Sequence, residues 1–190
     1  MSSVDSILDS KSEAYYDPAA DFSGVMPEGS YKAYATELTV KENLVIKNKY
    51  LADVYEVTFE VAKENSDNTY ERDGKEVSGK VFVGKNVKSK GFFRFKKPDP
   101  STYPGLEENS GSNKSYKELV ESFSVSLEED SEGRFFLPSV DESDIAGMPV
   151  LIDVYHSKWV DNEGKERTTP RAGAIYVWDG QKKKEEDLPF

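Results

Sequence analysis

The residues best suited to chemistry in this sequence form a basic and aromatic run between positions 85 and 97. Cations spaced along a strand follow the phosphates of a nucleic acid, and flat rings between them accept unstacked bases. Each such stack contributes about 1–3 kcal/mol to the binding of a single strand. The run therefore predicts a groove for single-stranded nucleic acid, with these candidate contacts: Lys85, Lys88, Lys90, Phe92, Phe93, Arg94, Phe95, Lys96 and Lys97.

Alternation along this run decides which side chains share a surface. On an extended strand, Phe93 and Phe95 lie on one face, and Phe92, Arg94 and Lys96 lie on the other. One of these two faces is expected to line the groove. Packing into a core is the better explanation for any single phenylalanine, whereas a groove is the better explanation for the cluster.

A second group of cations and large rings lies on a hairpin that is expected to turn at residues 161–164. The two tryptophans of this group have an alternative role, because they could pack against each other across the hairpin as a cross-strand pair. The sequence leaves both roles open. The candidates on this hairpin are Lys158, Trp159, Lys165, Arg167, Arg171, Tyr176 and Trp178.

The distribution of charge supports a polyanionic partner, although the formal net charge of −11 argues against one. Residues 72–97 hold nine Lys or Arg against two acidic residues, a net charge of +7. Residues 98–155 hold three basic residues against thirteen acidic ones, a net charge of −10. A local basic segment is what nucleic-acid binding requires, and total charge is the weaker guide.

Several catalytic chemistries find no support in the sequence. There is no cysteine and a single histidine, which excludes disulfides, thiolate catalysis and cysteine-based zinc sites. His156 is expected to be structural, and no phosphate-binding glycine loop or nucleophile elbow is present. We expect no enzyme activity, no cofactor and no metal. The carboxylates considered and set aside as metal ligands are Asp99, Asp141, Asp144 and Asp153.

The elements that must position these groups are mainly strands. Residues 53–62 alternate cleanly and predict a half-buried strand. The one convincing helix covers residues 114–125, where apolar side chains recur at i, i+3, i+4 and i+7 behind a cap at Asn113. Further strand material is expected over residues 31–40, 76–83, 91–95, 149–159 and 171–178.

The order of these elements predicts a mainly β fold. Five strands with one α-helix between the third and fourth strands are typical of the OB-fold, a Greek-key barrel, here with an extra hairpin. In that fold the loop between the last two strands borders the binding groove. A β-sandwich with one helix is the rival. The domain is expected over residues 27–178, between a flexible acidic arm (1–26) and an acidic C-terminal tail (179–190).

The tail ends in acidic residues followed by Leu-Pro-Phe, and the chain resembles phage single-stranded-DNA-binding proteins and, at this tip, bacterial ones. The resemblance implies sequence-independent binding of single-stranded DNA in phage replication, recombination and repair, in the cytoplasm of an infected bacterial host. It also implies that the tip recruits replication or recombination enzymes. No membrane segment is evident. The tip residues are Glu185, Glu186, Asp187, Leu188, Pro189 and Phe190.

The tail departs from the bacterial pattern in two ways. Residues 182–184 are three lysines directly before the acidic tip, and no long Gly/Pro/Gln linker separates the tip from the barrel. Both departures favour a tail that acts on its own barrel by competing with DNA for the basic groove. The alternative function is a virion or tail-associated β-domain that mediates protein–protein contacts, which leaves the basic and aromatic run unassigned.

Deleting residues 187–190 tests the competing tail. The deletion is expected to leave folding intact and to tighten the apparent affinity for single-stranded DNA at low salt, because acidic side chains no longer occupy the cationic groove. Titration of oligo-dT against both proteins at low and high salt measures the effect. An unchanged or weaker affinity of the shortened chain would remove the competing role without affecting the groove.

Overall fold

A computed structural model describes residues 24–180 of the chain, and this part is mainly β. Most of the expected arm (1–26) and of the expected tail (179–190, with the tip 185–190) lies outside the described residues. The strands are β1 (Gly29–Ile46), β2 (Tyr50–Val61), β3 (Thr69–Arg72), β4 (Lys75–Ser78), β5 (Asn86–Ser89), β6 (Phe92–Lys96), β7 (Pro149–Val160) and β8 (Glu166–Val177), and the α-helices are α2 (Lys114–Ser122) and α3 (Glu142–Ile145).

Five of these strands pair in a closed ring, which we call the barrel. β1 pairs with both β2 and β7, β7 pairs with β8, and β5 joins β8 to β2. All of these pairings are antiparallel except the one between β5 and β8. The five strands belong to one sheet, whereas the rival β-sandwich requires two. β6 extends this sheet along β2, and β3 with β4 forms a separate two-stranded hairpin.

Alternating apolar side chains fill the barrel. Tyr55, Val57, Phe59 and Val61 of β2 are all buried, as predicted for a strand with one face on a core. They meet apolar side chains from β1, β7 and α2 in one continuous cluster. Removal of this much apolar surface from water is the main driving force for the fold, at roughly 25 cal/mol for each Å² buried.

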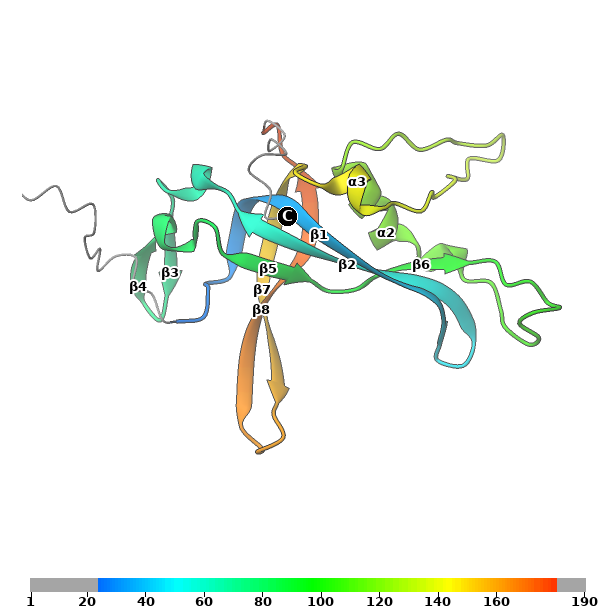
Figure 1. Ribbon diagram of the computed structural model, residues 1–190, viewed down its shortest axis with the longest axis horizontal. Helices are drawn as coiled ribbons and strands as arrows, with labels where there is room; N and C mark the ends of the chain where they lie inside the picture. Colours follow the sequence, from blue (N-terminus) through cyan, green and yellow to red (C-terminus); the bar gives the residue numbers. More distant parts are fainter. Residues whose placement is uncertain (1–23, 181–190) are drawn as a thin grey trace, which may run out of the picture.

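Two hairpins carry the sheet beyond the barrel. β1 continues past the predicted end at residue 40 to Ile46 and returns as β2, through a turn in which Lys47 and Asn48 have positive φ. The hairpin of β7 and β8 projects away from the body of the molecule (Figure 1). The predicted strand over residues 76–83 is too long, because β4 ends at Ser78 and a 3-10 turn over Gly79–Phe82 buries Phe82 instead.

Helix α2 packs its apolar stripe on the barrel core, as its periodicity predicts, but it is shorter than predicted. It ends at Ser122, and Phe123 is buried just beyond it. Asn113 is not a side-chain cap of this helix, which corrects the sequence prediction. No helix among residues 24–180 has the length and apolar character needed to cross a membrane.

The side chain of Asn113 instead binds the free edge of β6. Its Oδ1 accepts a hydrogen bond from the backbone N–H of Phe95 at 2.7 Å, and its Nδ2 donates to the Phe95 carbonyl at 3.0 Å. A carboxamide can do this because it carries both an acceptor and a donor, like a peptide group. Asn113 thus takes the place of a neighbouring strand at this one residue.

Replacing Asn113 by alanine is expected to lower the free energy of unfolding by about 2 kcal/mol, because two partly buried hydrogen bonds of about 1 kcal/mol each are lost. Asn113→Ser separates this role from helix capping, since serine caps a helix well but cannot bridge both backbone groups. We expect the serine variant to be as destabilised as the alanine variant in urea unfolding. If Asn113→Ser were as stable as wild type, the result would support helix capping as the role of Asn113. Ser112→Ala, which removes an exposed side-chain hydrogen bond next door, is the matched control.

Candidate nucleic-acid interface

The basic and aromatic run forms two strands separated by a bulge. Thr58 lies opposite Lys88, and Tyr55 lies opposite Phe92. The basic and aromatic run therefore holds one more residue than β2 between these two pairs. The hydroxyl oxygen of Ser89 accepts a hydrogen bond from the backbone N–H of Val57 at 2.9 Å, in place of a backbone partner. A Cβ at Gly91 would lie 2.7 Å from Val54. A side chain at position 91 would therefore displace the side chain of Val54.

Beyond the bulge, Phe93 and Phe95 share one face, as the alternation predicts. Their rings stack with centroids 5.9 Å apart, and Tyr50 of β2 meets the Phe95 ring edge-on at 6.0 Å. Phe93 is 37% exposed, which is high for an aromatic side chain on a paired strand. Phe92 points the other way into the core and is 3% exposed. The structure thus presents a short aromatic row of Phe93, Phe95 and Tyr50.

Two cations lie opposite each other on the outer face of the barrel. Lys88 of β5 is the register partner of Arg171 of β8, and the adjacent partners Ser89 and Ala172 point into the barrel. Tyr155 of β7 lies opposite Arg171 on its other side and is 38% exposed. Within residues 24–180 neither Lys88 nor Arg171 forms an ion pair. Like charges in such a pair are destabilising without a counter-ion.

Arg94 and Lys96 lie on the opposite face of β6 and share a buried carboxylate. The side chain of Asp53, which is 6% exposed, accepts contacts from Arg94 Nη1 at 3.1 Å and from Lys96 Nζ at 2.7 Å. Burial alone would raise the pKa of Asp53. Hydrogen bonds from Lys96 and the Asn43 backbone N–H, together with both positive charges, outweigh burial and lower this pKa below its usual value.

The cations of the β7–β8 hairpin are largely paired with neighbouring acids. Lys158 contacts Glu166, Lys165 contacts Glu163, and Arg167 contacts Asp161 at 2.7 Å. The opposed pair of Trp159 and Arg167 lies on the same hairpin face as the opposed pair of Tyr155 and Arg171. The two pairs are separated by an even number of residues on each strand, and side chains alternate between the faces. Trp159 is 51% exposed, and its indole N–H donates to Thr169 Oγ1 at 3.0 Å. This hairpin face therefore carries two rings, Tyr155 and Trp159, and two cations, Arg167 and Arg171.

Tyr176 and Trp178 do not join this group. They lie at the other end of β8, and the Trp178 ring contacts Tyr34 at 5.6 Å with Lys32 Nζ above it at 5.7 Å. The cross-strand tryptophan pair is therefore wrong, because Trp159 is opposite Arg167 and Trp178 follows the strand. Nearby Asp153 raises the pKa of the Tyr176 hydroxyl through its charge and a hydrogen bond.

The remaining candidates have local partners. The ammonium of Lys85 lies 6.0 Å from the Phe82 ring, and that of Lys90 lies 6.0 Å from the Phe92 ring.

The backbone N–H of His156 donates to Glu28, and its ring nitrogen Nε2 bonds the Met26 carbonyl at 2.8 Å, a structural role as predicted. Among residues 24–180 no cluster of acidic or histidine side chains could hold a metal ion.

Comparison with known proteins adds no family assignment. No protein-family model matches the chain, and a search of curated proteins finds no match.

The Asp53 cluster predicts a specific dependence of stability on pH. A carboxylate whose pKa is lowered by folding stabilises the fold above its unfolded pKa of about 3.9, and this contribution is lost as the pH falls through the folded pKa. Asp53→Asn is expected to cost about 2–3 kcal/mol at neutral pH, less than a fully buried pair, because both cations keep some solvent contact. The gap between wild type and variant should close in acid, as measured by urea unfolding across pH.

Glu56→Gln provides the matched control for this pH series. Glu56 is also on β2 but forms an exposed ion pair with Lys41, so its loss should cost under about 1 kcal/mol. A gap between wild type and Asp53→Asn that stays constant from neutral to acid pH would contradict the charged role of Asp53.

Proposed function

We propose that this chain binds single-stranded DNA without sequence preference, on the outer face of a barrel of the OB type. Three features support the barrel type: the ring order β1-β2-β5-β8-β7, the parallel closure between β5 and β8, and the position of α2 between β6 and β7. OB-folds bind strands on the face of their second and third strands, between the first and last hairpin loops. That face corresponds here to β2, β5 and β6.

The single observation that carries the proposal is the opposed pair of Lys88 and Arg171. Two cations side by side on an outer face, with no acidic partner among residues 24–180, are stabilised by an anion that lies over both. A phosphate diester supplies that anion. The Phe93–Phe95 stack follows on the same face, about 15 Å further along the strand. A chain of alternating phosphates and bases matches this sequence of cations and rings.

The rest of the predicted site has a smaller part in this proposal. Arg94 and Lys96 are partly neutralised by Asp53, and Phe92 belongs to the core. Trp159 and Arg167 border the face from the β7–β8 hairpin. The acidic tip 185–190 lies outside the described residues, and its competition with DNA for Lys88 and Arg171 belongs to the same proposal.

Titration of oligo-dT against intrinsic tryptophan fluorescence tests the proposal. We expect quenching at low salt that weakens as salt rises, with a log–log slope of about −0.7 for each phosphate contact. Lys88→Gln and Arg171→Gln should each weaken binding and reduce the slope by about 0.7. An absence of binding to oligo-dT at low salt would overturn the proposal and leave a protein-binding β-domain as the alternative.

Lys75→Gln is the matched control for these two variants. Lys75 belongs to the same basic segment of the sequence, but it lies on the separate β3–β4 hairpin. Its replacement changes net charge by the same amount and is expected to leave the salt slope unchanged. Equal losses for all three variants would show that overall charge, not the opposed pair, governs binding.

A further inference from the structure

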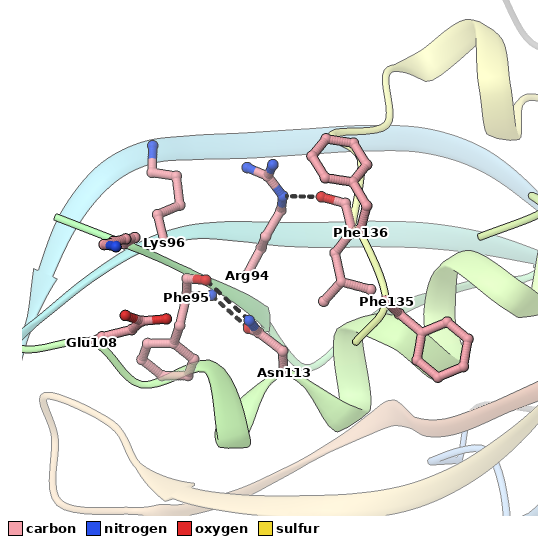
Figure 2. A pocket seen from close by; sticks show the side chains of 9 residues that line it. Arg94, Phe95, Lys96, Glu108, Asn113, Phe135 and Phe136 are labelled. Carbon is pink, nitrogen blue, oxygen red and sulfur yellow. Dashed lines mark hydrogen bonds between the residues drawn. The ribbon is translucent and has the colours of Figure 1, made fainter. Parts of the chain in front are cut away.

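The free edge of β6 opens into a pocket of about 420 Å³ that shares only Phe95 with the proposed DNA face. Cations and rings line it together: Arg94, Lys96 and Lys97 from β6 and the residue after it, and Phe95, Phe135 and Phe136. Figure 2 shows Arg94 and Lys96 pointing to one side of β6 and the Phe95 ring pointing to the other. The pocket thus reaches from the Phe95 side of the strand to the Arg94 side.

Phe136 is the most exposed ring of this pocket, although its backbone is held in place. Its N–H donates to the Glu128 carbonyl at 2.9 Å, and the next carbonyl, of Leu137, accepts from Arg94 Nε at 3.0 Å. The Phe136 side chain nevertheless remains 66% exposed. The ring of its neighbour Phe135 already has a partner, because the Lys117 ammonium lies 4.4 Å from the centre of that ring. A fixed loop therefore presents one largely exposed aromatic face to solvent, on which the flat ring of a ligand can stack.

The polar groups around Phe136 indicate the chemistry of that ligand. Lys97 is exposed and forms no ion pair within residues 24–180, so it can take a phosphate. Glu108 also lines the pocket and can accept a hydrogen bond from an N–H group. A nucleotide offers a flat ring, an N–H donor on the edge of the base and a phosphate. The side chains of an acidic peptide carry no flat ring to stack on Phe136, so the pocket favours the nucleotide.

The pocket adjoins the aromatic row, and this indicates the path of a bound nucleic-acid strand. Phe95 stacks on Phe93 on the proposed DNA face, and the same Phe95 lines the pocket. We propose that a single strand leaves the Phe93–Phe95 stack, passes around the edge of β6 and places a further base on Phe136, with its phosphate at Lys97. This inference rests on the proposed function and extends its binding site to the loop between α2 and α3.

Oligonucleotide length separates this extended site from the barrel face. We compare wild type with Phe136→Ala by fluorescence titration of a short oligo-dT of about 5 nucleotides and a longer one of about 16, the range of OB-fold sites. Loss of one base stack should weaken binding of the longer strand about tenfold and leave the short strand unchanged. Phe136→Tyr keeps a flat ring and should bind both strands like wild type. Because Phe136 is largely exposed, thermal unfolding is expected to be the same for all three proteins.

Each other outcome is decisive. Equal affinity of wild type and Phe136→Ala for both lengths would overturn the inference and leave the barrel face intact. Equal losses at both lengths would also overturn it, because Phe136 would then act within the short site. If wild type binds neither oligonucleotide at low salt, the proposed function itself fails, and the Phe136 site fails with it.

Discussion

Closure of the barrel depends on a very short contact, the parallel pairing of β5 with β8. Two residue pairs form it in the described chain, Lys88 with Arg171 and Ser89 with Ala172. Because side chains alternate, the register that buries Ser89 and Ala172 also turns both cations outward, side by side. The same serine completes the bulge by accepting the Val57 N–H. Closure, bulge and cation pair are therefore three consequences of one register, and the fold cannot close this way without placing Lys88 and Arg171 side by side.

Alternation within single strands made much of the fold predictable. β2 and β7 lie close to their predicted ranges, because their apolar faces meet one core. The β1–β2 hairpin tip was missed because its side chains are mostly exposed and its turn has no glycine. Asn48 was the available signal, since asparagine tolerates positive φ. The bulge at Ser89 depends on spacing to two partner strands and has no local pattern of its own.

The same holds for the candidate site: features set by neighbouring residues were predictable, and features set by residues far apart in the sequence were not. The shared face of Phe93 and Phe95 followed from two-residue spacing. The neutralisation of Arg94 and Lys96 did not, because Asp53 lies some forty residues earlier and meets them only through the β2–β6 register. Exposed Phe136 was visible in the sequence as one of two adjacent rings, but only the Arg94–Leu137 bond shows that its loop meets the edge of β6.

The exposed rings of this surface are held in position before any ligand arrives. Phe93 and Phe95 lie on a strand that is paired with β2 on one side and fixed at Phe95 by Asn113 on the other. Ordering a flexible side chain or loop on binding costs about 0.5–1.5 kcal/mol for each rotamer-rich group, and rigid presentation avoids most of that cost. The edge contact made by Asn113 therefore links the stability of the fold to the geometry of the proposed binding face. If the edge of β6 loosened, the Phe93–Phe95 stack would lose its fixed geometry even though neither ring had changed.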